Sequence, residues 1–164
     1  MPQRVAKTPE QAYASLCRLC ARAEKSSGDA LRLMRTWGLS ESQSRAVLDK
    51  LLSERFIDDS RYAGAFVREK MRFSGWGEYK IRSALAAKRI DRQTIDRAME
   101  EFGPADRESA AQRLSAQLVR RLRTLRRDDP RKLRASLMRY GLSLGYDFET
   151  VSDAVAQLAA GDDE

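Results

Sequence analysis

Hydrophobic residues recur with a helical period along nearly the whole chain, and no segment shows the sustained apolar–polar alternation of a strand. The first stripe has the spacing i, i+3, i+4 and i+7 and consists of Tyr13, Leu16, Cys17 and Cys20. The chain has only nine glycines and four prolines, which argues against a turn-rich all-β protein. The pattern therefore predicts an all-α fold.

The predicted helices group into three units of three, because the third helix of each unit carries matching positions. Leu39, Ile90 and Tyr146 each precede a third helix, and the residues nine positions later are Leu48, Met99 and Val155. The offsets between units are 51 and 56 residues. A unit of this size has a small core, so neighbouring units are expected to pack together. We expect three tandem three-helix repeats that form an elongated, curved helical array.

This alignment also predicts the boundaries along the chain. We expect a flexible N-terminal tail, three helical repeats and an acidic tail, at residues 1–9, 10–56, 57–103, 104–159 and 160–164. Gly103-Pro104 marks the start of the third repeat, and Asp129-Pro130 is a suitable cap and first turn for its second helix. The first helix of this repeat has an inner stripe of Leu114, Leu118, Leu122 and Leu125.

Acidic and hydroxyl side chains are expected to begin several helices. Asp29 is predicted to cap a helix over 30–37, and Ser40 is predicted to begin the next one. Asp58 and Asp59 could serve as paired carboxylates for acid–base chemistry, but adjacent residues at a helix start point in different directions, so a helix cap is favoured. The helix that follows has a predicted buried stripe of Tyr62, Ala63, Phe66, Val67 and Phe73.

The residue types that are missing exclude several kinds of chemistry. The chain has no histidine, which excludes His-based catalytic triads and His-ligated metals. Its two cysteines, Cys17 and Cys20, lie in the middle of a predicted helix rather than at a helix start after a strand, so we expect reduced core thiols and not a redox motif. We predict no enzyme activity, no cofactor, no metal and no small-molecule substrate.

The chain also lacks the signals of export or membrane insertion. Its first ten residues have no apolar core of a secretory signal. No uncharged apolar run approaches the roughly 18 residues that a membrane span needs. The expected protein is cytoplasmic, without a membrane partner, and a monomer.

The positive charge is concentrated in one stretch. Between Ala105 and Arg139 there are eleven basic and four acidic residues, which accounts for the whole net charge of +7. Arginine outnumbers lysine ten to one there, which favours bidentate contacts with phosphate or carboxylate groups. The predicted partner- or DNA-binding residues in this stretch are Arg113, Arg120, Arg123, Arg127, Arg131 and Arg134.

A second basic segment surrounds two glycines. The run from Arg72 to Lys80 mixes cations and aromatics, as a base-stacking surface would, but lacks the signature of a phosphate-binding loop. We favour a glycine turn whose aromatic side chains pack between helices. Lys80 and Arg82 remain predicted surface contacts.

One motif resembles a known family. The string Phe56-Ile57-Asp58-Asp59-Ser60-Arg61-Tyr62-Ala63-Gly64-Ala65-Phe66-Val67-Arg68 is similar to the signature of bacterial RecX regulatory proteins. The block from Lys80 to Ile90 resembles the next family block, although Arg89 stands where a glycine is usual. In the last repeat, Leu144-Gly145-Tyr146 resembles the family's Arg-Gly-Phe, with leucine in place of arginine. The resemblance covers roughly residues 10 to 158.

Membership in that family would imply three tandem three-helix repeats and a role as regulator. It would imply binding to the RecA recombinase filament on single-stranded DNA, and inhibition of its ATPase, recombinase and strand-exchange activities. The protein would thereby modulate DNA repair, homologous recombination and the SOS response. The residues that match the signature, which we expect to be mainly structural, are Asp58, Asp59, Arg61, Tyr62, Phe66, Val67 and Arg68.

Other functions remain open at this stage. A stand-alone basic DNA-binding module would bind bare DNA, duplex as well as single-stranded, with a steep salt dependence and no recombinase partner. An adaptor for another acidic protein would bind without changing any ATPase. An enzyme is disfavoured, because no motif places a nucleophile beside a base.

Overall fold

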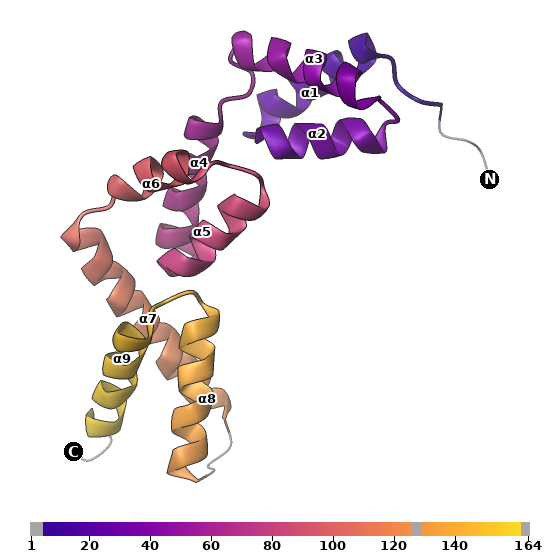
Figure 1. Ribbon diagram of the computed structural model, residues 1–164. Helices are drawn as coiled ribbons and strands as arrows, with labels where there is room; N and C mark the ends of the chain where they lie inside the picture. The colour runs from indigo at the N-terminus through magenta and orange to yellow at the C-terminus, as the bar shows by residue number, and fades with distance from the viewer. Residues whose placement is uncertain (1–4, 126–128, 162–164) are drawn as a thin grey trace. The chain divides into compact units, whose positions relative to one another are not determined.

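The structure is a computed structural model that describes residues 5–125 and 129–161. Within these ranges the chain forms nine α-helices and one π-helical turn and no strand, so the all-α prediction is confirmed (Figure 1). The helices are α1 (Pro9–Arg22), α2 (Ser27–Thr36), α3 (Glu41–Ser53), α4 (Asp59–Glu69), α5 (Glu78–Ala87), α6 (Arg92–Glu100), α7 (Pro104–Thr124), α8 (Pro130–Ser143) and α9 (Phe148–Gly161), and the π-helical turn is η1 (Lys70–Ser74).

The chain divides into two compact units, each made of two separate segments. Unit 1 consists of Met1–Ala65 and Leu85–Ala98, and unit 2 consists of Phe66–Ala84 and Met99–Glu164. The boundary between the units passes through α4, α5 and α6. The predicted division into three repeats therefore stays a prediction, and each unit is described by itself.

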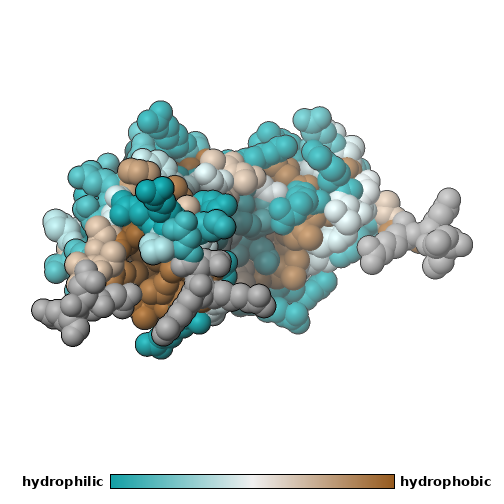
Figure 2. Space-filling model, turned by 90° about the horizontal axis from the view of Figure 1, so that it is seen from below, coloured by the Kyte–Doolittle hydropathy of each residue, from teal (hydrophilic) through white to brown (hydrophobic). Residues whose placement is uncertain are grey.

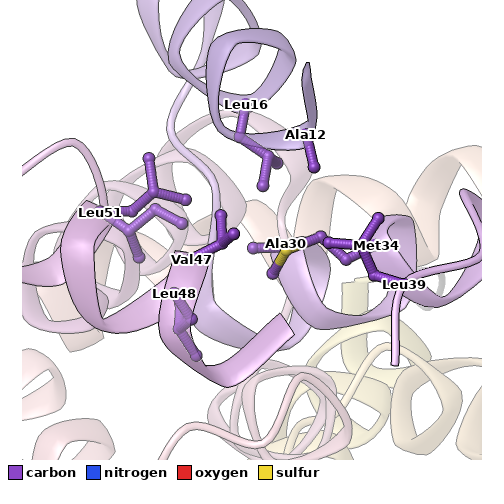
Figure 3. Close-up of a cluster of buried hydrophobic side chains, with 9 residues drawn as sticks. Ala12, Leu16, Ala30, Met34, Leu39, Val47, Leu48 and Leu51 are labelled. Atoms are coloured by element: carbon purple, nitrogen blue, oxygen red, sulfur yellow. The ribbon is translucent and has the colours of Figure 1, made fainter. Parts of the chain in front are cut away.

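Helices α1, α2 and α3 form the core of unit 1. Their buried apolar side chains point toward one another (Figure 3), and the cluster consists of Ala12, Leu16, Ala30, Met34, Leu39, Val47, Leu48, Leu51 and Ile57. Cys17 and Cys20 are free thiols that pack against this cluster and are half-buried. Burial raises the pKa of the Cys20 thiol, as expected for an unreactive packing residue.

The cap of α2 differs from the sequence prediction. The helix begins at Ser27, and its N-cap is Ser26, whose hydroxyl accepts a hydrogen bond from the backbone N–H of Asp29. Asp29 is not the cap, because it is the third helical residue and its carboxylate accepts from the Ser26 N–H in a capping box. The Asp29 carboxylate, which is 8% exposed, also lies 3.0 Å from both Lys88 Nζ and Arg32 Nη2.

The third helices of the three predicted repeats begin with closely related caps. The Ser40 hydroxyl accepts from the Gln43 N–H at the start of α3. Asp91 and Asp147 each accept two hydrogen bonds from the threonine three residues later, one from its N–H and one from its hydroxyl. The backbone and hydroxyl donors of that threonine lower the pKa of each aspartate. The capping geometry therefore repeats in register with the apolar positions.

The cap at Asp147 predicts a pH-dependent contribution to stability. Its carboxyl pKa is lower in the folded state, so its contribution is present above the unfolded-state pKa of about 4 and is lost as pH falls through the folded-state pKa. Asp147→Ala is expected to cost about 1 kcal/mol at pH 7. Thermal unfolding at pH 7 and at about pH 2 should show that the difference from wild type shrinks in acid. Asp153→Ala, at an exposed site in the same helix, is the control, and an equal loss in that variant would contradict the cap.

Helices α7, α8 and α9 pack against one another in unit 2. Of the predicted inner stripe of α7, Leu114 and Leu118 are fully buried, whereas Leu122 and Leu125 are half-buried at the end of the helix. Hydrophilic side chains cover much of the face in Figure 2, with apolar side chains visible between them. The other buried members of this core are Ala110, Leu137, Tyr146, Val151, Ala154 and Val155.

The π-helical turn η1 corrects the predicted stripe of α4. In a continuous α-helix, Phe73 would share the inner face with Phe66, seven residues earlier. Each hydrogen bond in a π-helix spans one residue more, which changes the register. Met71 is consequently buried, whereas Phe73 is 87% exposed. The turn ends at Gly75, which adopts a φ of 66°.

Candidate nucleic-acid interface

The basic stretch predicted from the sequence lies on α7 and α8, two helices of unit 2. Residues 109–124 of α7 and 130–143 of α8 contain no aspartate or glutamate. Seven of their basic side chains are exposed, namely Arg120, Arg121, Arg123, Arg131, Lys132, Arg134 and Arg139. Two acid-free helical segments with this many exposed cations attract polyanions and acidic protein surfaces.

Helices α7 and α8 contact each other, so the exposed cations of both helices lie on one helix pair. The helices pack against each other, and the Arg121 guanidinium lies 5.4 Å from the centre of the Tyr140 ring. Arg120 and Arg123 flank that contact in the last two turns of α7. Arg131 and Arg134 occupy the beginning of α8, where no acidic residue is present in the first turn.

Four of these cations have no acidic partner among the described residues. Within the residues that the structure describes, no carboxylate forms an ion pair with Arg120, Arg123, Arg131 or Arg134. Elsewhere, Arg61 pairs with Glu24 at 2.6 Å and Arg68 pairs with Glu101 at 3.4 Å. Unpaired arginines keep their donors available, so the α7–α8 cations form the candidate interface.

The structure separates Arg113 from the exposed members of the predicted set. Its side chain is half-buried, and its Nε is buried without a hydrogen-bond partner among the described residues. Burial raises the pKa of Tyr146, and the nearby charge of Arg113 opposes that shift. The Tyr146 hydroxyl lies 3.1 Å from the carbonyl oxygen of Gly75 and 3.2 Å from that of Ala110, and donates toward them. Arg113 therefore lies beside the core of unit 2.

The remaining basic residues of the predicted set have other surroundings. Arg127 lies outside the described residues. The Lys80 ammonium lies 4.3 Å from the centre of the Trp76 ring, and Arg82 Nε donates to Glu78 Oε1 at 2.9 Å. Arg82 also lines a groove of about 340 Å³ in unit 2, together with Tyr79 and Arg107. Arg82 thus has an acidic intramolecular partner, whereas Arg120, Arg123, Arg131 and Arg134 have none among the described residues.

The charged residues of the signature motif fix the start of α4. Asp58 Oδ1 accepts a hydrogen bond from the Arg61 N–H, and Asp59 Oδ1 accepts from the Ser27 N–H at 2.8 Å. Arg61 donates to Glu24 and to the carbonyl oxygens of Arg55 and Phe56. The hydrogen bond to Glu24 is the main cause of the raised Arg61 pKa. These contacts join the start of α4 to the start of α2 and to the segment after α1.

The remaining signature residues also have packing or pairing roles. Tyr62 and Val67 are buried, and the Lys88 ammonium lies 5.4 Å from the centre of the Tyr62 ring. Phe66 packs edge-on against Trp76, with ring centres 6.2 Å apart. Together with the Arg68–Glu101 pair, these contacts give every signature residue a structural contact.

The sequence interpretation did not single out Arg121, Lys132 and Arg139, although all three are exposed on the same two helices. The signal that could have identified them is the absence of acidic residues from 109–124 and 130–143, rather than the spacing of arginines along one face. Among the described residues, no group of three His, Cys, Asp or Glu side chains is arranged to hold a metal ion. In the same residues, no helix has the length and apolar character of a membrane span.

The fold and the surface define a class of protein: an all-helical repeat protein with two packed helices whose residues 109–124 and 130–143 are basic and contain no acidic residue. The family model that describes the second three-helix domain of RecX matches residues 58–99. The Regulatory protein RecX of Clostridium botulinum is 30% identical over 138 residues, or 83% of this chain and 61% of that relative. The Regulatory protein RecX of Pseudomonas putida is 27% identical over 159 residues, or 97% of this chain and 96% of that relative.

Residues 58–99 thus match a RecX domain, and most of the chain is similar to Regulatory protein RecX of other bacteria. The chain spans 55% to 61% of the length of the first curated relatives that it matches. A crystal structure of regulatory protein RecX superimposes with a TM-score of 0.74 at 23% identity, covering 88% of this chain and 70% of that one. RecX from Lactobacillus salivarius gives a TM-score of 0.73 at 18% identity, covering 93% and 97%. The predicted fold class of helical repeats is confirmed.

Proposed function

We propose that this protein is a cytoplasmic, non-catalytic regulator that binds the RecA recombinase filament on single-stranded DNA. In this role it inhibits the ATPase, recombinase and strand-exchange activities of RecA and so modulates DNA repair and homologous recombination. The observation that carries the proposal is the set of exposed, unpaired arginines on α7 and α8 of a RecX-family fold. A nucleoprotein filament offers both phosphates and carboxylates to such a surface.

The test is to titrate this protein into RecA on single-stranded DNA at near-physiological salt and to measure ATP hydrolysis. We expect inhibition. Full inhibition well below one molecule per RecA protomer would indicate that filament growth is blocked or disassembly promoted. Inhibition that requires about one molecule per protomer would indicate a coating of the filament groove. Unchanged hydrolysis at saturation would contradict the proposal.

The second candidate function is a stand-alone DNA-binding module, which the excess of arginine over lysine on α7 and α8 also favours. Such a module would bind bare DNA with a steep salt dependence. It would lower ATP hydrolysis by RecA only by occupying the DNA, so hydrolysis would return to its normal rate once enough free DNA is supplied. Adding excess single-stranded DNA to the ATPase assay distinguishes the two functions. Relief of inhibition by free DNA would favour the module.

A further inference from the structure

Phe73 is the most exposed aromatic side chain among the described residues, at 87%. It belongs to η1, which interrupts the helical register between α4 and α5. Single exposed apolar side chains are common on proteins, but π-helical turns occur frequently at functional sites. The question is what this side chain contacts when the protein is bound.

The backbone around Phe73 is held rigidly. The N–H groups of Gly75 and Trp76 both donate to the Lys70 carbonyl oxygen, the latter at 3.0 Å. The Tyr146 hydroxyl donates to the Gly75 carbonyl oxygen, and the Gly77 N–H donates to Leu144 O at 2.7 Å. Phe73 therefore projects from a turn with a fixed conformation, and little conformational entropy is lost when its ring is buried in a complex.

The cations nearest to Phe73 in sequence are already engaged by neighbouring groups. The Lys70 ammonium lies 4.8 Å from the centre of the Trp76 ring and 3.6 Å from Glu69 Oε1. The Arg72 guanidinium lies 5.7 Å from the centre of the buried Phe102 ring. Binding of single-stranded nucleic acid combines base stacking with cations that hold the phosphates. Because Lys70 is paired with Glu69 and covered by Trp76, it is a poor phosphate ligand, and a protein pocket suits the Phe73 ring better than a nucleotide does.

We propose that Phe73 is an anchor that inserts into an apolar pocket on a protein partner, separately from the phosphate contacts of α7 and α8. The phenyl ring has no polar group, so the complementary pocket is wholly apolar and about the size of one ring. The identity of the partner rests on the proposed function, in which the partner is the RecA filament. The anchor contributes to protein recognition, whereas the arginines contribute to binding of DNA.

The test compares Phe73→Ala with wild type in binding to RecA filaments on single-stranded DNA and in binding to bare single-stranded DNA. We expect about tenfold or more weaker binding to the filament and unchanged binding to bare DNA. Phe148→Ala, which removes a 67% exposed aromatic of the same unit, is the matched control and should bind the filament like wild type. The melting temperature of Phe73→Ala should match that of wild type, because the ring is exposed.

Two conservative variants distinguish a protein pocket from a stacked base. Phe73→Leu keeps an apolar side chain and should restore most of the filament affinity, whereas Phe73→Tyr adds a hydroxyl that the pocket disfavours. The reverse order, or loss of bare-DNA binding in Phe73→Ala, would show a stacking role and overturn the anchor. Normal filament binding by Phe73→Ala would overturn the anchor alone. Failure of the wild-type protein to bind the filament would overturn the proposed function as well.

Discussion

The double variant Arg120→Glu, Arg123→Glu is expected to bind the RecA filament about 100-fold more weakly than wild type and to lose inhibition of ATP hydrolysis. A charge-assisted hydrogen bond contributes about 1.5 kcal/mol or more, and two such contacts correspond to about a hundredfold in affinity. Both side chains are exposed and lack an internal carboxylate partner within the described residues. Their replacement therefore removes intermolecular contacts without breaking ion pairs of the fold.

The matched control is Arg35→Glu, Arg45→Glu, which changes the net charge equally. Arg35 and Arg45 are exposed in unit 1, and Arg35 lies in the last turn of α2 just as Arg123 lies in the last turn of α7. The unfavourable effect of a glutamate on the helix dipole is therefore present in both variants. Circular dichroism should show the same helix content in each. Equal weakening by the control would mean that net charge, and not the α7–α8 surface, determines binding.

The variant Gly77→Ala is expected to destabilise unit 2 by about 3 kcal/mol or more. A Cβ at this position would lie 2.4 Å from the carbonyl carbon and oxygen of Gly145 and 2.5 Å from the nitrogen of Tyr146. These are backbone atoms, so no side-chain rotation can relieve the clash. The segments are also joined by hydrogen bonds from Gly77 N to Leu144 O and from Tyr79 N to Gly145 O, which the variant must stretch or break.

Gly103→Ala provides the comparison for this experiment. Gly103 precedes α7 with a φ of −85°, and a Cβ there would meet no atom within 4 Å. We expect its effect on unfolding in urea to stay within about 0.5 kcal/mol. Similar midpoints for Gly77→Ala and wild type would show that the close approach of the two backbone segments is not required for stability.

The helical fold was predictable because it depends on local signals. The apolar period and the caps at Ser40 and Asp129 act within a few residues of each other. The cap of α2 was predicted three residues too late, because both Ser26 and Asp29 are suitable caps and only the helix start distinguishes them. Phe73 was predicted as buried because an apolar period gives no indication of a π-helical turn.

Prediction of the candidate interface was limited by contacts between residues distant in sequence. The absence of acidic residues from 109–124 and 130–143 is visible in the sequence, and the exposure of Arg120, Arg123, Arg131 and Arg134 agrees with it. The half-burial of Arg113 depends on packing next to Tyr146, 33 residues away by number. The pairing of Arg61 with Glu24 is likewise a tertiary contact, and no spacing rule indicates it.

Arg89, which stands where RecX-like sequences usually have a glycine, adopts a left-handed backbone conformation. Its φ is 61°, a backbone conformation that glycine adopts freely and arginine only with strain. The glycine that is usual at this position in RecX-like sequences thus has a conformational reason. This chain keeps the left-handed turn at position 89 despite the arginine. The side chain of the preceding residue, Lys88, lies 3.0 Å from Asp29 in α2.

The contact between Asp29 and Lys88 can form only late in translation. Unit 1 combines Met1–Ala65 with Leu85–Ala98, so Asp29 meets Lys88 only after the ribosome has made the intervening segment. Residues 66–84 leave the ribosome before this contact can form, yet they belong to unit 2 and must wait for the chain beyond residue 98. Domains usually fold in order from the N-terminus during translation. We therefore expect the two units of this protein to complete their folding at overlapping times, so that a nascent chain halted after residue 84 exposes incompletely folded surfaces of both.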